Sequence, residues 1–412
     1  MKSPTGLRKK DSIMKKILSI IIVVILMLAL VSCDYDIVIQ KKTTTTTTTT
    51  NQLPPENPPV DEIYSEGLEF SLNDEGESYS VVSKGTCRDK DIVIPITYND
   101  LPVTSIGDSA FTACYSLKSV VIPASVTGIG SNAFYKCTSL TSIVIPDSVT
   151  NIGDGAFYGC TSLVSVTIPN SVMIIERDAF SNCDSLISIV IPDSVTTIGF
   201  SAFENCDSLT NVVILDAVTI IGNYAFGACH SLKSVEIGDS VTSIGENAFF
   251  SCESLTSVVI GNSVTSIGEF AFYCCTSLTN IVIPDSVTSI GEGAFYSCDS
   301  LTSVEIGDSV TSIGDAAFYS CDSLTSVEFG DNSQLTSIGE TAFYGCTSLT
   351  SIVIPDSVVS IGERAFSSCD CLTSITFKGT VKQWSAIEKV DGWNYKLPAT
   401  EVICSDGVVK LK

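Results

Sequence analysis

The sequence predicts a solenoid of about twelve stacked 23-residue coils, with a parallel β-sheet on one face and short helical or 3₁₀ turns and short strands opposite. Three observations predict it. An Ala-Phe pair recurs at an almost constant interval along most of the chain. Apolar residues alternate ahead of each repeated turn. The chain is 44% hydrophobic and only 17% charged, as expected where every coil buries its apolar side against its neighbours.

The recurring phenylalanine sets the length of one coil. Its interval is 23 residues throughout, except for one interval of 25 between Phe318 and Phe343. The two additional residues fall near positions 331–334, where a turn is longer. The twelve positions are Phe111, Phe134, Phe157, Phe180, Phe203, Phe226, Phe249, Phe272, Phe295, Phe318, Phe343 and Phe366.

Within one coil, two short apolar patterns predict two strands. Leu301, Val304 and Ile306 are spaced so that alternate side chains share the inner face of a strand. Val287 and Ile290 repeat the spacing of Leu301 and Val304 on a second side of the coil. Stacking the coils therefore builds a parallel sheet from the first pattern, with short strands from the second pattern on the opposite side.

The remainder of the coil predicts a bend and a turn. Gly291 follows the second apolar pair, where a φ above zero favours glycine over bulkier residues. The segment 292–298 then reads as a helical or 3₁₀ turn, because an acidic residue at its start interacts favourably with the helix dipole.

The beginning of the chain has the features of an export signal. Residues 1–16 are rich in lysine and arginine, and residues 17–31 form an unbroken apolar run shorter than a membrane-spanning helix. The tetrapeptide Leu30-Val31-Ser32-Cys33 resembles a bacterial lipobox, which implies cleavage before Cys33 and a lipid on its thiol. We therefore expect residues 1–33 to be a lipoprotein signal peptide, with an ordinary secretory signal as the alternative.

Residues 34–66 are expected to form a stalk. They contain eight consecutive threonines, Thr43 to Thr50, followed by four prolines within residues 54–59. Such a polar, proline-containing stretch buries too little apolar surface to offset its ordering entropy. The segment is thus interpreted as a spacer between the membrane and the folded part.

Charge and histidine content exclude several classes of function. The formal net charge is −24, and it becomes −28 for residues 61–412 alone. An acidic surface repels nucleic acids and anionic lipid headgroups. The one histidine, His230, is expected to have no acidic or nucleophilic side chain near it and leaves little material for a zinc site or a catalytic triad. We therefore expect no enzyme activity, no cofactor, no metal and no nucleic-acid partner, and membrane contact only through the lipid anchor.

The Leu-x-x-Ile-x-Ile spacing, joined to Ile-Gly-x-x-Ala-Phe-x-x-Cys, resembles the BspA-like leucine-rich repeats, a class of bacterial surface proteins. The resemblance covers about residues 67–412. It implies an N-terminal coil or cap at 67–106, leucine-rich repeats at 107–378 and a C-terminal cap at 379–412. It also implies an exported, lipid-anchored protein at the bacterial cell surface, with an adhesin-like role towards extracellular or cell-surface proteins.

Every position of the repeat becomes a row of side chains in a stacked solenoid. Cysteine recurs three residues after each buried phenylalanine, which favours a core row over serial disulfides. Only Cys87, Cys274, Cys371 and Cys404 stand outside this row and remain candidates for a bridge. An Asp or Asn row follows each Pro or Gly turn, and we expect each side chain to cap its own turn, with calcium binding as the alternative.

Two further rows are candidates for ligand binding. The outward row on the strands is rich in valine, which indicates either a partner surface or simply β-propensity. A flanking row of Ser or Asn residues, such as Ser303, gives this strand row a hydrogen-bonding border. Tyrosines follow the buried phenylalanine in half of the coils and either pack over the helical turns or stack on sugar rings. The candidate ligand-binding residues of the strand row are Val144, Val190, Val213, Glu236, Val259, Val282, Glu305, Glu328 and Val353.

These rows predict a non-enzymatic, surface-displayed binding protein that recognises host or neighbouring-cell proteins through its repeat face. Many weak repeated contacts, rather than one deep site, are expected to supply the affinity. Two alternatives remain open at this point. One is a carbohydrate-binding module, with or without calcium, and the other is a structural spacer without a specific ligand.

Overall fold

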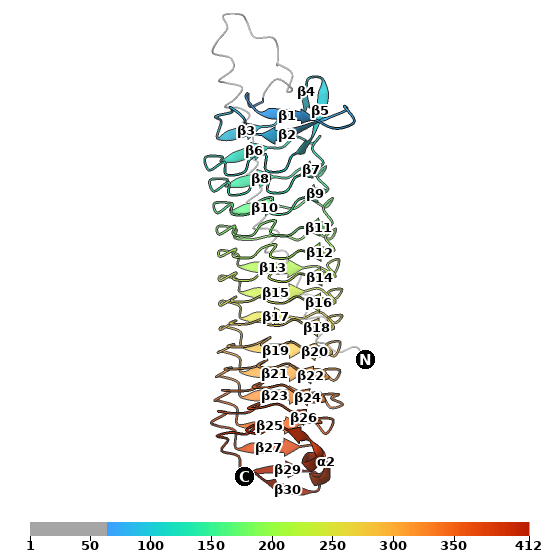
Figure 1. Cartoon of the computed structure of the whole chain (residues 1–412), viewed down its shortest axis with the longest axis vertical. Coiled ribbons are helices and arrows are strands. Elements are labelled where there is room, and N and C mark those ends of the chain that lie inside the picture. Colours follow the sequence, from blue (N-terminus) through green and yellow to red (C-terminus); the bar gives the residue numbers. More distant parts are fainter. Residues whose placement is uncertain (1–63, 412) are drawn as a thin grey trace, which may run out of the picture. The chain divides into compact units, whose positions relative to one another are not determined.

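The computed structural model describes residues 64–411, so the predicted signal peptide and the stalk up to residue 63 lie outside the described residues. The chain divides into two compact units. Unit 1 contains the described residues of Met1–Val172 together with Cys183–Val190, and unit 2 contains Met173–Asn182 and the described residues of Ile191–Lys412. Each unit is a stack of coils whose short strands form parallel sheets on two sides (Figure 1).

Unit 1 carries two sheets. One sheet has the order β1-β2-β5-β7-β9, with β4 paired to β5. The other sheet has the order β10-β8-β6-β3. Its only antiparallel pairs among the described residues are β1 with β2 and β4 with β5, at the start of the unit. The strands are β1 (Glu69–Leu72), β2 (Tyr79–Ser83), β3 (Asp91–Val93), β4 (Thr97–Tyr98), β5 (Leu101–Ile106), β6 (Ser119–Val121), β7 (Gly128–Ile129), β8 (Ser142–Val144), β9 (Asn151–Ile152) and β10 (Ser165–Thr167).

Unit 2 carries one continuous sheet of two-residue strands and three shorter sheets of mostly four-residue strands. The continuous sheet contains β11 (Ile174–Ile175), β12 (Thr197–Ile198), β14 (Ile220–Ile221), β16 (Ser243–Ile244), β18 (Ser266–Ile267), β20 (Ser289–Ile290), β22 (Ser312–Ile313), β24 (Ser337–Ile338), β26 (Ser360–Ile361) and β28 (Glu388–Lys389). We call it the second sheet. The shorter sheets contain β13 (Asn211–Ile214), β15 (Ser234–Ile237) and β17 (Ser257–Val259); β19 (Asn280–Ile283), β21 (Ser303–Ile306) and β23 (Ser326–Phe329); and β25 (Ser351–Ile354), β27 (Ser374–Phe377), β29 (Glu401–Cys404) and β30 (Gly407–Lys410).

A ladder of phenylalanine rings runs through the core of each unit. All twelve repeat phenylalanines are buried. In unit 2, neighbouring rings from Phe180 to Phe366 stack nearly parallel with centroids 5.2–5.5 Å apart. In unit 1, Phe134 lies between Phe111 and Phe157 in the same way. The repeat spacing thus places identical rings in register, and each coil fills the core of the next.

The segment around the Ala-Phe pair is not helical, which corrects one detail of the predicted fold. It consists of two successive turns, closed by Ala248 N–H donating to Gly245 O and Cys252 N–H donating to Phe249 O. The third residue of each turn, Asn247 and Ser251, has φ of 54° and 52°. A 3₁₀ helix needs negative φ throughout. The left-handed residues instead point their N–H groups at carbonyls of the next coil, where Asn247 donates to Glu269 and Ser251 to Tyr273.

The repeated glycine after the second strand is required by close approach and not by a positive φ, as the sequence had indicated for Gly291. Its φ is outside the left-handed region. A Cβ on Gly291 would lie 2.7 Å from main-chain atoms of Gly268 and Glu269 in the preceding coil. Stacked coils therefore touch backbone to backbone at this position, and no side chain fits between them.

The C-terminal residues close the stack of unit 2. Helix α2 (Val381–Ala386) is the one helix among residues 64–411, and a capping box between Thr380 and Gln383 fixes its start. Trp393 lies edge-on to Phe366 at 6.2 Å and to Trp384 at 5.7 Å. Trp393 thereby covers the face of the Phe366 ring that no further repeat phenylalanine covers.

The predicted fold class is confirmed, with a small difference in the number of coils. Strand β3 precedes the first phenylalanine-containing coil, and β28 and β29 continue the parallel ladders after the last one. The chain therefore has about 14 turns rather than about 12. Among the described residues, no helix is long and apolar enough to cross a membrane.

Candidate binding surface

The strand row predicted to bind ligand lies in register on the parallel strands. In unit 2, Val213 pairs with Glu236 and Glu236 with Val259 across β13, β15 and β17. Val282, Glu305 and Glu328 pair in the same way across β19, β21 and β23. Each pairing keeps the row on one face, because side chains at the same register of parallel strands point the same way.

Exposure separates the members of this row. Val144, Val259, Val282 and Val353 are 40%, 43%, 54% and 43% exposed. Glu305 and Glu328 are exposed as well, whereas Val190, Val213 and Glu236 are half-buried. The segment that holds Val190 makes an isolated bridge through Ser188 and forms no strand. The strongest apolar exposure therefore lies on β17, β19 and β25.

A shallow groove of about 470 Å³ lies on this face of unit 2. Its lining combines apolar and acidic side chains from β19, β21, β23 and the turns that follow them. It includes Val282, Pro284, Asp285, Glu305, Glu328 and Phe329. The groove thus coincides with the part of the strand row where two glutamates replace valine.

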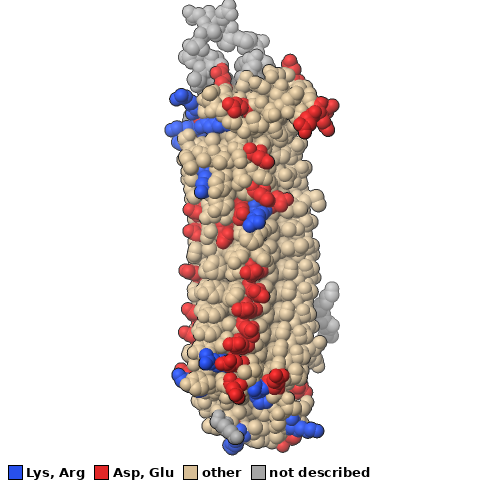
Figure 2. Space-filling view, viewed as in Figure 1, with Lys and Arg blue, Asp and Glu red and all other residues tan. Residues whose placement is uncertain are grey.

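The coils around the groove contain no basic residue. From Ser234 to Glu363 the sequence has 17 aspartates and glutamates and no lysine, arginine or histidine over 130 residues. Figure 2 shows a line of acidic side chains over the strands labelled β15 to β23 in Figure 1. The net negative charge of the folded part is therefore concentrated here, because no basic residue offsets the carboxylates, a feature that a scan of the sequence for basic residues would have found.

Four members of the predicted Asp and Asn row, Asp216, Asp239, Asp285 and Asp308, cap the next coil and not their own turn. Asp216 Oδ1 accepts the N–H of Asp239 at 2.9 Å, and Asp239 Oδ1 accepts the N–H of Asn262 at 3.0 Å. The same contact joins Asp285 to Asp308 at 2.9 Å. In these three contacts glycine precedes the donor, as at Gly238, and the backbones then approach closely enough. Within residues 64–411, no three Asp, Glu, His or Cys side chains converge on a metal position.

The tyrosine row stacks on itself rather than over helical turns. Ring centroids of Tyr296 and Tyr319 are 4.5 Å apart with planes 7° from parallel, and those of Tyr319 and Tyr344 are 4.8 Å apart. Tyr273 continues the file towards Tyr296 at 5.1 Å. The ring faces therefore contact each other, and the faces that a sugar ring would stack on are occupied.

The cysteine row lies in the core, as the sequence predicted. From Cys137 to Cys369 every row member is fully buried and is a free thiol. Each Sγ donates to the carbonyl of the phenylalanine in the preceding coil, for example Cys252 to Phe226 at 3.2 Å and Cys298 to Phe272 at 3.3 Å. Burial raises the pKa of the Cys252 thiol to about 12. The four cysteines outside the row are free thiols too.

We expect Ellman's reagent to separate these thiols by accessibility. Cys371 is exposed and should react at once in the native protein, whereas the row from Cys137 to Cys369 should react only when the protein unfolds. Measured thiol equivalents before and after adding denaturant check this, and Cys371→Ser should remove the fast phase. A row that reacts in the native protein as fast as Cys371 would contradict the hydrogen-bonded core ladder.

His230 has an acidic neighbour that the sequence did not reveal. Its Nδ1 lies 2.9 Å from Asp207 Oδ1 in the preceding coil. Both side chains are about half exposed. The pair is a surface contact between coils, and the error arose because residues 23 positions apart become neighbours in a stack.

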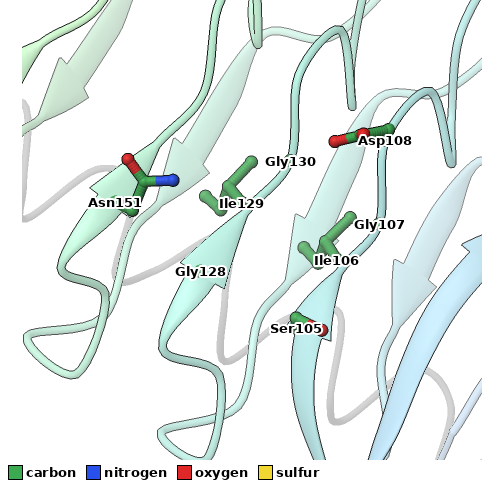
Figure 3. A pocket seen from close by; sticks show the side chains of 8 residues that line it. All are labelled: Ser105, Ile106, Gly107, Asp108, Gly128, Ile129, Gly130 and Asn151. Carbon is green, nitrogen blue, oxygen red and sulfur yellow. The ribbon is translucent and has the colours of Figure 1, made fainter. Parts of the chain in front are cut away.

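Besides the groove in unit 2, a depression of about 360 Å³ lies in unit 1, on the sheet that contains β5, β7 and β9 (Figure 3). It opens at Gly128, where a Cβ would have no heavy atom within 4 Å. Two of its polar side chains already have partners, since Asp108 accepts the N–H of Ser131 at 2.8 Å and the Ser105 hydroxyl bonds to that of Ser80. The depression thus results from one missing side chain, and no ligand is assigned to it.

The comparisons with known proteins agree with this architecture. A family model described as the BspA type leucine rich repeat region, in six copies, matches residues 87–210, 196–325 and 265–387. A leucine-rich repeat protein from Bacteroides ovatus is 31% identical, with 83% of this chain and 94% of that chain covered and a TM-score of 0.65. A leucine rich cell surface protein from Faecalibacterium prausnitzii is 32% identical, with 82% and 99% covered and a TM-score of 0.51.

No curated protein sequence matches the chain significantly. The match to the family model nevertheless extends over most of the described residues, and it follows the same coils that carry the phenylalanine and cysteine ladders. Two solved structures exceed 30% identity over more than four fifths of the chain. This chain therefore belongs to the BspA type leucine-rich repeat family.

Proposed function

We propose that this protein is a non-enzymatic, surface-displayed binding protein that recognises host or neighbouring-cell proteins through the strand row. The observation that carries the proposal is the exposure of Val259, Val282 and Val353 on a sheet face. Polar residues at these positions would cost nothing in solvent. Contiguous exposed apolar side chains are typical of a partner surface, and Val259 and Val282 lie on consecutive strands of this face.

The repeated arrangement supports recognition by many weak contacts. Burying the exposed half of one valine side chain contributes roughly 1 kcal/mol, so the exposed valines of the face supply useful affinity only together. The flanking serines, such as Ser257 and Ser303, lie half-buried beside the row and offer hydroxyl groups to a partner. Avidity along the face therefore substitutes for one deep pocket.

Export and anchoring are part of the same proposal. Residues 1–33 supply the lipoprotein signal, Cys33 carries the lipid, and residues 34–66 form the stalk that holds the repeats away from the membrane. The sequence of these segments supports this placement. The relative from Faecalibacterium prausnitzii is named a cell surface protein, which supports the same location.

The carbohydrate alternative loses its main support. A sugar-binding aromatic platform needs free ring faces, and the tyrosine rings stack on one another. The aspartates of the row use one oxygen to accept main-chain N–H groups of the next coil. Both rows therefore support glycan binding less than the exposed valines support protein binding.

The proposal predicts that purified protein binds immobilised extracellular-matrix proteins saturably and without need for calcium. The triple change Val259→Glu, Val282→Glu and Val353→Glu should weaken this binding at least tenfold, because it removes apolar contacts and adds charge to the face. Surface plasmon resonance on a panel of matrix proteins, beside a glycan array, with calcium and with chelator, measures this.

A matched triple variant controls for general effects of added charge. Ile174, Ile220 and Val359 are exposed apolar residues at the second sheet, with 43%, 45% and 61% exposure. Changing these three to Glu should leave binding unaltered. Loss of binding in this variant alone would place the site on the second sheet. If the native protein bound neither the matrix proteins nor the glycan array, a structural spacer would remain as the function.

A further inference from the structure

We propose that the groove over β19, β21 and β23 binds a basic segment of the partner protein, with an arginine or lysine between Glu305 and Glu328 and an apolar side chain on Val282. The inference rests on the proposed function and names the partner chemistry at its centre. It commits the groove to a cationic protein segment rather than to a metal ion or a glycan.

The geometry of three adjacent strands supports a shared cation. Glu305 and Glu328 pair in register on neighbouring parallel strands, about 4.8 Å apart. Like charges placed opposite each other on a sheet destabilise it. A guanidinium between the two carboxylates relieves this repulsion, because it can donate N–H groups to both of them.

Val282 completes the same line of side chains. Val282 lies on β19, pairs with Glu305 on β21 and is 54% exposed, the highest exposure among the valines of the strand row. Pro284 and Phe329 add apolar lining to the groove beside it. A partner segment that alternates basic and apolar side chains therefore finds an apolar contact and a charge contact on adjacent strands.

Charge complementarity extends well beyond the two glutamates. The 130 residues from Ser234 to Glu363 carry 17 carboxylates without any basic residue, so nothing within these coils neutralises them. A field of one sign over several coils attracts a cationic partner and speeds its association. An anionic ligand is disfavoured by the same field.

The groove fits a protein segment better than a bound metal. Asp285, which lines the groove, directs Oδ1 to the N–H of Asp308 at 2.9 Å, and Asp308, which follows the lining residue Gly307, directs Oδ1 to the N–H of Asn332 at 3.0 Å. Calcium prefers six to eight oxygen ligands, whereas this groove combines few free carboxylates with apolar lining. The apolar part has a use only for a ligand that carries apolar side chains.

The test uses a fluorescein-labelled decapeptide of alternating Arg and Val, titrated with the purified protein and followed by fluorescence anisotropy. We expect saturable binding that weakens as salt is raised. Decapeptides of alternating Glu and Val, and of alternating Arg and Ser, should bind weakly or not at all. Equal binding of the Arg-Ser peptide would overturn the apolar contact with Val282.

Paired variants locate the site. The double change Glu305→Gln and Glu328→Gln should weaken binding of the Arg-Val peptide roughly tenfold, since two exposed charge pairs are lost. Glu269→Gln with Glu292→Gln removes the same charge from exposed positions after β18 and β20 and should leave binding within about twofold. Equal weakening by the two variants would reduce the effect to non-specific attraction and overturn the proposal.

Two further outcomes are decisive. Stoichiometric calcium binding that displaces the peptide and is lost in the Glu305 and Glu328 variant would make the groove a cation site and overturn the inference. Absence of peptide binding at low salt would also overturn it. The proposed function fails separately, because matrix-protein binding that depends on the exposed valines does not require the Arg-Val peptide to bind.

Discussion

Raising the pH above 9 is expected to destabilise the protein progressively and to unfold it near pH 11, because the cysteine ladder must stay protonated in the folded state. Burial raises the pKa of Cys252 from 9.0 to about 12, and it shifts the other buried ladder thiols with resolved pKa changes in the same direction. Between these two values the unfolded state binds fewer protons than the folded state, so stability falls as pH rises.

The expected size of this effect is large. A thiol such as Cys252 costs about 1.4 kcal/mol of folding free energy for each pH unit between 9 and 12. Domains are typically stable by about 5–15 kcal/mol, so a few such thiols suffice for unfolding near pH 11. Below pH 9 the thiols are protonated in both states and have no influence on the pH dependence. Urea denaturation at pH 7, 9 and 10, followed by circular dichroism, measures the loss.

A variant with fewer ladder thiols isolates their contribution. Cys252→Ala with Cys275→Ala should lower stability at pH 7, because small cavities form and two Sγ hydrogen bonds are lost. Its stability should nevertheless fall less steeply above pH 9 than that of the native protein. The same steepness in both proteins would assign the alkaline transition to the tyrosine and lysine side chains instead.

The repeat made most of the fold predictable. A period of 23 residues with Phe, Cys and paired apolar positions fixes which side chains face the core, and the structure buries those of Phe295, Cys298 and Leu301 completely. It did not reveal how neighbouring coils touch, because the partner of each residue lies 23 positions away. Thus the carboxylate of Asp285 was expected to cap its own turn, yet it accepts the N–H of Asp308 in the next coil.

Backbone conformation was the other feature that sequence reasoning missed. Non-glycine residues such as Asn247, Phe270 and Ala316 adopt φ between 52° and 54°, which residue type alone did not indicate. Their N–H groups bond to carbonyls of the following coil, and this stacking outweighs a local cost of about 1 kcal/mol. For the candidate site, the strand register was predictable from the period, whereas the groove and the difference in exposure between Val213 and Val282 required coordinates.

Gly291→Ala is expected to be among the most damaging single substitutions in the chain. The new Cβ would lie 2.7 Å from main-chain atoms of Gly268 and Glu269 in the preceding coil, and backbone atoms have no rotamer to change. The coils must then separate, which breaks the hydrogen bond from Gly291 N–H to Ile267 O at 3.0 Å and loosens the adjacent ring stack. We expect a loss of about 3 kcal/mol or more in the free energy of unfolding, measured by urea denaturation.

Gly128→Ala provides the matched control. Both changes add one methyl group to a glycine, Gly128 within the short strand β7 and Gly291 directly after the short strand β20. A Cβ at Gly128 has no heavy atom within 4 Å, and its φ is outside the left-handed region. This variant should be neutral or more stable by a few tenths of a kcal/mol, since alanine reduces the entropy of the unfolded chain. If the two variants lost equal stability, glycine would matter here for backbone freedom, and contact between the backbones of neighbouring coils would not be what sets the spacing of the repeat.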